Sequence, residues 1–587
     1  MQLNFKKILQ YLIFVNCLAL FILPELNNVH YYPSPSFWAE INFAWVSVII
    51  FLLVCYSSPN LYFPRVIIPI IGFIIFLLIQ PFFITIDFIG LSYISEIELA
   101  LCILLAISFN TLIHEFTLKR IVTYIAISIV IGGIFQSLIG IIQYSGFYKS
   151  FGSLIFYDSR HPTTNIFGHL GQRNHYCHYL TWAIFSLIYL FLIDKLKKLP
   201  FILLICLFLF SITIAASRSV FIYFALAVII SFFFFLTQKK QEQKKLALTL
   251  FLLVSMSTLL LVLFEYFYPL INIFPHHKQI DSGLTRLAIA NNTDGIAGRR
   301  AIEWAKSFMT FKQYPIFGYG WLQFASQSVN LASLFPHEHL NDGLFTNPHS
   351  LIFQLLADTG LIGTFIFLTG FIYTIYHIIK NNSIETTIIV CMIATTIAHS
   401  LLEYPLFYFF FLGSFIIFLS IDKSIIILPK KPFIIIMTIP LVILISLIIK
   451  SSIMFDKLVE YGDVPTEQEK FIQQGKTLES IAQNDKLFAY YALYTLDDYI
   501  IINNPNTNAL FEPELQLKLM DKLSNFHPWP STLIKQAMLN WNLHNEEKAK
   551  RLTQIAIIAY PNYKKSILKQ LKGKKYYQLE EIVKSNK

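Results

Sequence analysis

The chain has 587 residues and is 55% hydrophobic and 16% aromatic, yet only 14% of its residues are charged. Soluble domains carry about 25% charged residues, so this composition excludes an ordinary soluble protein and indicates a polytopic membrane protein. The net charge of +10 does not indicate nucleic-acid binding, because Lys and Arg lie mostly between apolar stretches, where they set membrane topology.

Apolar stretches long enough to cross hydrocarbon as a helix recur along most of the chain. Helices are expected throughout, because backbone amides left unpaired in lipid are strongly unfavourable. The first stretch lacks a small-x-small cleavage site, which favours a retained helix over a signal peptide. We predict an all-α fold with about thirteen transmembrane helices, at residues 8–24, 38–56, 65–84, 91–113, 121–144, 176–193, 200–216, 219–236, 247–270, 350–379, 384–401, 404–421 and 433–450.

Basic residues fall in every second connection between these stretches: Lys6, Lys7, Arg65, Lys119, Arg120, Lys195, Lys197, Lys198, Lys239 to Lys245, Lys380, Lys423, Lys430 and Lys431. The positive-inside rule therefore places the amino terminus and these connections in the cytoplasm. Segment 145–175, loop 271–348 and the tail from residue 451 then lie on the other side. The Lys and Arg of loop 271–348 do not count against this, because such long loops escape the rule.

The tail is polar, with apolar residues at helical spacing. Its stretch STLIKQAMLNWNLHNEEKAKRLTQIAIIAYPN predicts a helix-turn-helix unit, broken at Asn542 to Asn545 and stopped near Pro561. That unit resembles a tetratricopeptide-like hairpin, although three clear repeats are not found. We predict a membrane domain of residues 1–450 and a helical domain of residues 451–587, with a docking surface for a protein partner as a further possible role of the latter.

Polar clusters that hydropathy does not explain all lie on the non-cytoplasmic side. FGHLGQRNHYCHYL (167–180) leads into a span and contains His169, Gln172, Arg173, Asn174, His175 and His178. Asn174 is a reasonable N-cap, but a cap requires neither three histidines nor an arginine. AASRSVF (215–221) places Arg218 where positive charge is normally avoided, so that it either snorkels to the interface or meets an anionic partner.

Three further clusters follow. Arg299 and Arg300 head an amphipathic helix; they are ordinary surface arginines or a phosphate site, since guanidinium pairs phosphate through a planar fork. TNPHSLIFQLLADTGLIG (346–363) puts His349 at the mouth of a span. AHSLLEYPLFYF (398–409) contains His399, Glu403 and Tyr404. The Glu403 carboxylate is either functional or pairs with an arginine to hold the bundle together.

Arginines near a candidate base at one membrane surface suit transfer from a lipid-linked pyrophosphate. The pyrophosphate is a good leaving group and needs charge stabilisation, whereas an acceptor hydroxyl needs a base, for which histidine is matched at neutral pH. The chain contains no P-loop, GxGxxG motif, acidic metal cluster or CxxC spacing, so we predict neither a metal nor another cofactor.

Five motifs in order resemble the bacterial O-antigen ligase/polymerase superfamily: FGHLGQRNH, the SRS turn, GRRAIEW to YPIFGYGW, NPHSLIFQLLADTGLIG and HSLLEYPLFYFFFLG. The GQRNH and EYPL elements look most like its protein-glycosylating branch, the PglL-type O-oligosaccharyltransferases. The resemblance covers about residues 130 to 420, and the tail is also similar to that branch. The family often has Asn where this chain has Ser350 and Glu where it has Asp358, which leaves the role of Asp358 open.

The resemblance implies a GT-C-like enzyme of the bacterial inner membrane, with its active site and tail in the periplasm. It implies transfer of a glycan from undecaprenyl pyrophosphate to a Ser or Thr of a periplasmic or pilin-like protein. His349 would activate the acceptor hydroxyl, while Gln172 and Tyr404 would hold glycan or pyrophosphate. The pyrophosphate would be bound by Arg218 and Arg300, with Arg299 as a substitute, and the predicted substrate-binding set is completed by His175, Asn174 and Glu403.

Three alternatives remain open at this point. A ligase would transfer the glycan to lipid A core, and a polymerase would join repeat units. A transporter or flippase would instead place polar residues at mid-span and break helices in both halves of the chain, whereas here they gather at one leaflet. The expected partners are a lipid-linked oligosaccharide, an acceptor protein and the lipid bilayer, with no nucleic acid.

Overall fold

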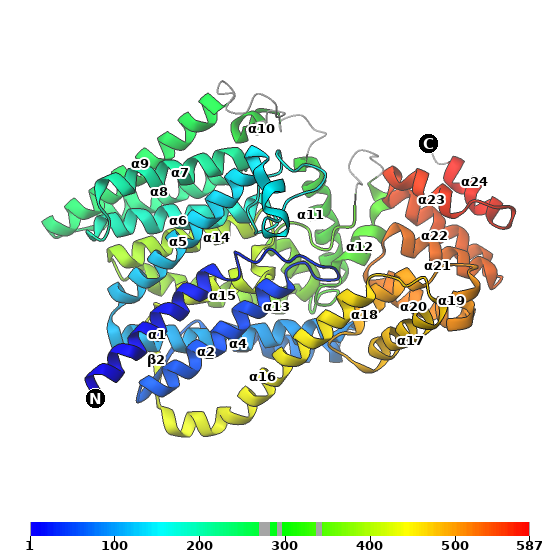
Figure 1. The fold of residues 1–587 in the computed structure, drawn as a ribbon, viewed down its shortest axis with the longest axis horizontal. Coiled ribbons are helices and arrows are strands. Elements are labelled where there is room, and N and C mark those ends of the chain that lie inside the picture. Colours follow the sequence, from blue (N-terminus) through cyan, green and yellow to red (C-terminus); the bar gives the residue numbers. More distant parts are fainter. Residues whose placement is uncertain (1, 269–281, 290–295, 336–342, 586–587) are drawn as a thin grey trace.

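A computed structural model describes residues 2–268, 282–289, 296–335 and 343–585 (Figure 1). The described chain is helical apart from its connections and one two-stranded ribbon, which makes it an all-α polytopic membrane protein. Eight helices are long and apolar enough to cross a bilayer: α2 (Phe37–Ser57), α4 (Ile89–Phe116), α5 (Leu118–Ser145), α7 (Lys198–Ala215), α8 (Val220–Thr237), α9 (Gln241–Phe267), α13 (Leu351–Ile379) and α16 (Lys430–Tyr461).

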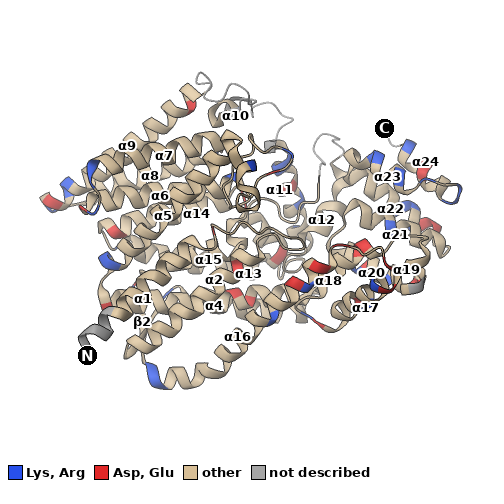
Figure 2. Ribbon diagram, viewed as in Figure 1, with Lys and Arg blue, Asp and Glu red and all other residues tan. Residues whose placement is uncertain are grey.

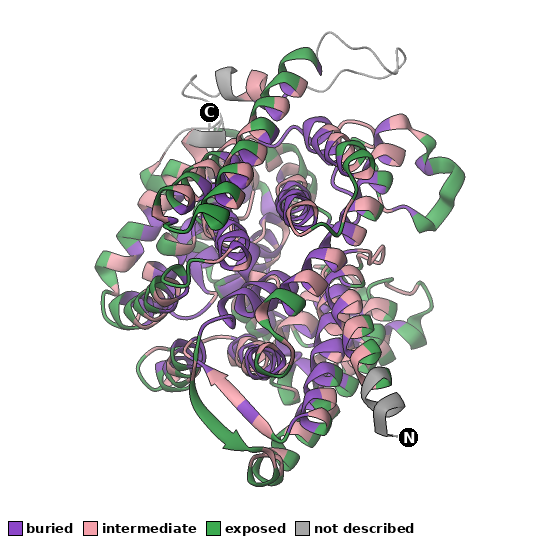
Figure 3. Cartoon of the chain, turned by 90° about the vertical axis from the view of Figure 1, so that its left-hand side faces the viewer, coloured by how far each residue is buried: buried purple, intermediate pink, exposed green. Residues whose placement is uncertain are grey.

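Further apolar helices complete the bundle: α1 (Gln2–Ile22), whose apolar part is Ile8–Ile22, and the shorter helices α3 (Ile67–Ile79), α14 (Ile384–Ser400) and α15 (Phe409–Leu419). The remaining predicted span is α6 (Arg173–Leu192), which lies inside the bundle, with every residue from His175 to Leu190 buried. Each of the thirteen predicted stretches therefore corresponds to a helix. Buried residues gather between the helices, and exposed residues cover the outside (Figure 3). The outer face of α16 exposes Ile435, Ile436 and Ile439, as expected of a helix that faces lipid.

The helices run so that the basic connections share one end of the bundle, which we call the basic end. Lys and Arg mark this end, where the amino terminus lies (Figure 2). Two of its connections are joined by an antiparallel ribbon of β1 (Asn60–Pro64) and β2 (Ser424–Pro429). The expectation of helices alone missed this ribbon, whose strands satisfy their backbone groups by pairing with each other outside the spans. Beside it, Arg65 Nη1 lies 2.8 Å from Asp422 Oδ1.

The opposite end, which we call the site end, carries the long segments. Segment 145–175 contains a 3-10 stretch, η2 (Phe147–Leu154), and the described part of loop 271–348 is largely helical. Its helices are α10 (Gly283–Ile289), α11 (Ile296–Gln313) and α12 (Phe324–Asn330). The rest of loop 271–348 lies outside the described residues.

Two predicted spans have different bounds in the structure. The span expected at 404–421 begins at Phe409, because Pro405 opens a 3-10 turn, η6 (Pro405–Phe407), so Tyr404 lies in a connection. The span at 350–379 is interrupted at Gly360, with φ 61° and ψ −157°. Segment 315–320 docks there: Leu361 N–H donates to Pro315 O at 2.8 Å, and Tyr319 N–H donates to Ala357 O at 2.8 Å. A Cβ at Gly360 would lie 2.5 Å from Ile316 O.

The tail is an array of short helices that packs against the site end (Figure 1). One of its cores includes Phe88 and Leu91 at the start of α4, and another includes Val329 of α12. The predicted hairpin is confirmed as α21 and α22, but position 450 lies inside α16, which continues to Tyr461. The division into two domains stays a prediction. The tail helices are α17 (Gln468–Asn484), α18 (Ala489–Leu496), α19 (Pro505–Leu510), α20 (Pro513–Phe526), α21 (Pro530–Asn542), α22 (Glu546–Ala559), α23 (Lys564–Gln570) and α24 (Tyr577–Ser585).

Candidate active site

The Glu403 carboxylate joins four of the five predicted clusters directly. Its Oε1 accepts hydrogen bonds from Asn174 Nδ2 at 3.0 Å and from Arg300 Nη2, and its Oε2 lies 2.6 Å from His349 Nδ1. The fifth cluster is joined through Asn174, whose Oδ1 accepts a hydrogen bond from Ser217 Oγ at 2.7 Å. One carboxylate thus gathers side chains that lie far apart in the sequence, all at the site end.

Glu403 is held charged by its neighbours. Its side chain is only 4% exposed, and burial by itself would raise its pKa. The hydrogen bond with His349 and the positive charge of Arg300 outweigh burial, so that the pKa lies below the ordinary value of glutamic acid. The pairing of Glu403 with an arginine, one of the two sequence-based interpretations, is present in the structure.

Replacing Glu403 with glutamine is expected to cost about 3 kcal/mol of stability near neutral pH, because Arg300 loses a buried anionic partner. The carboxylate has a lowered pKa in the folded protein, so its contribution is full above the unfolded pKa of about 4.3 and is lost as the pH falls through the folded value. In detergent, Glu403→Gln should therefore unfold at a lower temperature than wild type near neutral pH, and this difference in unfolding temperature should disappear on acidification. The control is Glu242→Gln, because Glu242 is exposed at the basic end. If the difference in unfolding temperature between wild type and Glu403→Gln stayed the same in acid, this account would be wrong.

His349 sits in a constrained turn before α13. Its φ of 52° is in the left-handed region, which a non-glycine residue rarely adopts, and its backbone N–H donates to Asn347 Oδ1 at 3.1 Å. Because Nδ1 faces the Glu403 acceptor, the neutral tautomer that this contact favours has its proton on Nδ1 and a lone pair on Nε2, on the other side of the ring. Nε2 makes no hydrogen bond with a described residue, and the side chain is 24% exposed. This arrangement suits a base that takes a proton from a ligand.

Arg218 lies in the reversal between α7 and α8, near two other guanidinium groups. Arg286 donates from Nη1 to Ala216 O at 2.8 Å in the same reversal, and Arg300 completes the group. The pKa of Arg218 lies below its ordinary value because of burial first, and then because of the charges of Arg286 and Arg300. Arg218 forms no ion pair with any of the residues that the structure describes. Arg218 therefore has a positive charge that no acidic side chain among the described residues offsets, which favours an anion.

Gln172 and Arg299 flank this network. Gln172 immediately precedes α6, and its Oε1 is buried without a hydrogen-bond partner among the described residues. Arg299 stands next to Arg300 on α11. These two residues are at the site end as expected, and their contact with a substrate stays a prediction.

The histidines of the first cluster separate into two groups. His169 Nδ1 lies 2.9 Å from Leu26 O, which ties the segment before α6 to the α1–α2 connection. His175 and His178 are buried in the bundle beside His399; His178 Nδ1 lies 2.9 Å from His399 Nδ1. The ring of His175 packs against Tyr408, with centroids 4.7 Å apart. These buried histidines pack beneath the network around His349, and a substrate contact of His175 stays a prediction.

Asp358 has a structural position. Its Oδ2 accepts hydrogen bonds from Leu322 N–H at 3.0 Å and from Gln354 Nε2. Its backbone carbonyl accepts one from Gly320 N–H at 3.1 Å. Asp358 thereby holds segment 315–322 against α13, which answers the question that its place in the motif left open.

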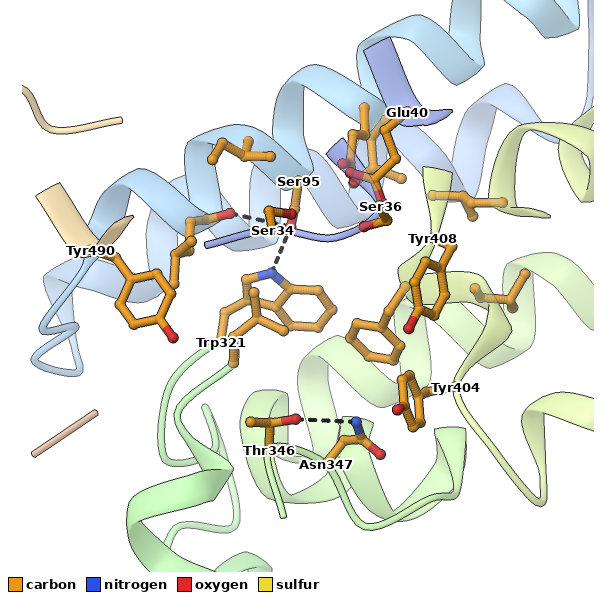
Figure 4. A pocket seen from close by; sticks show the side chains of 18 of the residues that line it. Ser34, Ser36, Glu40, Ser95, Trp321, Thr346, Asn347, Tyr404, Tyr408 and Tyr490 are labelled. Carbon is orange, nitrogen blue, oxygen red and sulfur yellow. Dashed lines mark hydrogen bonds between the residues drawn. The ribbon is translucent and has the colours of Figure 1, made fainter. Parts of the chain in front are cut away.

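A cavity of about 330 Å³ lies beside Tyr404 (Figure 4). The ring of Tyr404 packs edge-on against His349, with centroids 5.3 Å apart, and stacks with Tyr408, with centroids 6.0 Å apart (Figure 4). Neither the cavity nor Arg286 was predicted from the sequence. Arg286 lies in no recognised motif, but Glu40 and Glu98 of the cavity wall are carboxylates inside predicted spans, a signal that indicates function.

Comparisons with known families match three parts of the chain. Residues 182–368 match the family described as O-antigen ligase, and residues 166–191 match the family described as protein glycosylation ligase. Residues 388–572 match the family described as virulence factor membrane-bound polymerase, C-terminal. A search of curated proteins found no match. The three matched segments together contain every residue of the predicted site, from Gln172 to Tyr404.

Proposed function

The chain belongs to the O-antigen ligase/PglL superfamily of membrane glycan-transferring ligases, and from this premise we propose that it is a protein O-oligosaccharyltransferase. It transfers a glycan from undecaprenyl pyrophosphate to a Ser or Thr hydroxyl of a periplasmic or pilin-like protein. The match of residues 166–191 to protein glycosylation ligases supports a protein acceptor. The observation that carries the proposal is the His349–Glu403 pair beside the three arginines.

In the proposed reaction, the acceptor hydroxyl attacks the anomeric carbon of the first sugar. His349 Nε2 takes the proton of the hydroxyl, and Glu403 stabilises the imidazolium that forms. The bond between the anomeric carbon and the phosphate oxygen breaks, and undecaprenyl pyrophosphate leaves. Arg218 and Arg300, with Arg286, offset the negative charge that develops on the leaving group.

We further propose that the basic end faces the cytoplasm and the site end the periplasm of a bacterial inner membrane. The placement of the basic connections at one end supports this orientation through the positive-inside rule. Donor and acceptor then meet at the periplasmic surface, where the lipid pyrophosphate and a secreted protein are both accessible. Gln172 and Tyr404 hold the donor there, and Arg299 adds positive charge.

Expression in a bacterium that makes a lipid-linked glycan but lacks its own ligases is expected to place that glycan on proteins of the osmotic-shock fraction. Blotting with a glycan-specific antibody and mass spectrometry of Ser and Thr sites provide the measurement. Because these acceptors are periplasmic, the result tests the orientation as well. Cells carrying the empty vector are the control.

The second candidate is a ligase or polymerase that acts on lipid A core or on repeat units. The match of residues 182–368 to O-antigen ligases and that of residues 388–572 to polymerases favour it. The same cells discriminate the two: glycan on lipid A core, with none on protein, would transfer the chain to the ligase branch.

A further inference from the structure

We propose that the cavity beside Tyr404 is a binding site for an uncharged sugar ring of the transferred or accepting glycan. This inference rests on the proposed function, since it assigns a part of the substrate to a second place in the same site. The cavity has walls from several parts of the chain: the segment leading into α2, the first turns of α4, the segment around Trp321, the segment around Asn347, the α14–α15 connection and the tail (Figure 4).

The cavity has the polarity of a site for a hydroxyl-bearing ligand. Glu40 of α2 and Glu98 of α4 contribute carboxyl groups, and Ser34, Ser36 and Ser95 contribute hydroxyls. Glu98 makes no hydrogen bond with any residue in the described part of the chain, although it lines the cavity. Glu98 is half-buried, and a carboxyl that is partly removed from water is favourable only when a donor from a ligand or from water pairs with it.

Aromatic side chains form the rest of the wall. Trp321, Tyr404 and Tyr408 surround the cavity on the side of the membrane helices (Figure 4). Trp321 is fixed by the hydrogen bond from its Nε1 to Ser95 Oγ at 3.0 Å and by stacking on Phe407, with centroids 5.7 Å apart. Rigid aromatic faces next to hydrogen-bonding groups match a sugar, which has apolar C–H faces and a rim of hydroxyls.

Other parts of the substrates fit the cavity less well. No Lys or Arg from the described residues lines it, so a pyrophosphate would meet the carboxyl groups of Glu40 and Glu98 without a Lys or Arg side chain to pair with. A prenyl chain would leave the carboxyls and hydroxyls without partners. The volume of about 330 Å³ is at the lower end of the range of small-molecule sites, which fits a ring rather than a folded protein.

The tail closes the cavity. Tyr490 and Tyr491 of α18, together with Phe526 at the end of α20 and His527 after it, also line the cavity. Tyr490 Oη lies 3.2 Å from His527 Nδ1, which fixes both side chains. In this arrangement the tail contacts the glycan as well as any protein that it docks.

The test uses the full chain in lipid nanodiscs and compares Glu98→Gln with Glu96→Gln. Glu96 lies on the opposite face of α4, toward α16, and supplies a matched control with the same change. The probes are undecaprenyl pyrophosphate, the same lipid carrying an N-acetylhexosamine, the core oligosaccharide released from lipopolysaccharide, and a Ser-containing peptide. Affinities are measured by thermophoresis.

Glu98→Gln is expected to weaken binding of the sugar-bearing lipid about tenfold, the effect of losing one charge-assisted hydrogen bond, and to leave the bare lipid unchanged. Weaker binding of the core oligosaccharide alone also supports a sugar site and assigns it to the acceptor. Three results would overturn the inference. The wild-type protein could bind the two lipids with equal affinity, both variants could lose the same affinity for the sugar-bearing lipid, or only the affinity for the peptide could change. Arg218→Ala should weaken binding of both lipids. If it does not, the result contradicts the proposed pyrophosphate site but not the sugar site.

Discussion

Replacing His349 with alanine is expected to lower glycan transfer by a factor of about 10² to 10⁴, the contribution of a general base. The acceptor hydroxyl then has no group in the site to take its proton, whereas the pyrophosphate keeps its arginines. Binding of the donor should therefore change little while turnover falls. Transfer by the purified enzyme to an acceptor protein, followed by the mass shift of the acceptor, measures this effect.

The matched control is His377→Ala, because His377 lies near the opposite end of the same helix, α13. It should transfer at the wild-type rate. His349→Gln keeps a hydrogen bond to Glu403 but offers no basic nitrogen, so it should be as inactive as the alanine variant. Wild-type turnover in His349→Gln would remove His349 from the role of base and leave it a positioning role.

Replacing Arg218 with alanine should weaken binding of undecaprenyl pyrophosphate by about ten- to a hundredfold, as expected for charge-assisted hydrogen bonds to an anion. Arg218 is the member of the arginine cluster for which the described residues offer no anionic partner, so its charge is directed to a ligand. Arg218→Lys keeps the charge but loses the planar fork, and should recover only part of the affinity. Titration of the lipid into enzyme in nanodiscs gives these affinities.

Arg160→Ala is the control for charge alone, since Arg160 is exposed in the connection before α6 at the same end of the bundle. The loss for Arg218→Ala should exceed the loss for Arg160→Ala at physiological salt, where exposed charges are largely screened. Equal losses in the two variants would mean that the cluster attracts lipid only through its general charge.

The sequence predicts the helices, and the connections that share one end of the bundle, because both depend on local properties. Apolar length defines a span, and the charges of alternate connections set its direction, so each of the thirteen predicted stretches corresponds to a helix. The motifs also lie at the site end, because each one is either next to a span or inside the long loop 271–348. The start of α15 was placed too early because hydropathy does not register the turn that Pro405 imposes.

Contacts between distant segments could not be predicted from one sequence. Glu403 meets Asn174, Arg300 and His349 only after four segments far apart in the sequence have been brought together. The sequence offered the pairing with an arginine as one of two interpretations, but it did not say which arginine. The ribbon of β1 and β2 is likewise a pairing across most of the chain. Glu40 and Glu98 could have been recognised from the sequence, because a carboxyl inside a span is unfavourable and commonly indicates a functional site. That they line the same cavity could not, because the tail forms part of its wall.

The interruption of α13 at Gly360 has a mechanical consequence. Segment 315–320, which follows α11, is bonded to both sides of the interruption, and α13 begins two residues after His349. These hydrogen bonds tie the helix that carries Arg300 to the helix that follows His349, so we expect the two to move together during a catalytic cycle. Any movement that admits an acceptor or releases a product must come from the surrounding parts, namely the α7–α8 reversal, the α14–α15 connection or the tail.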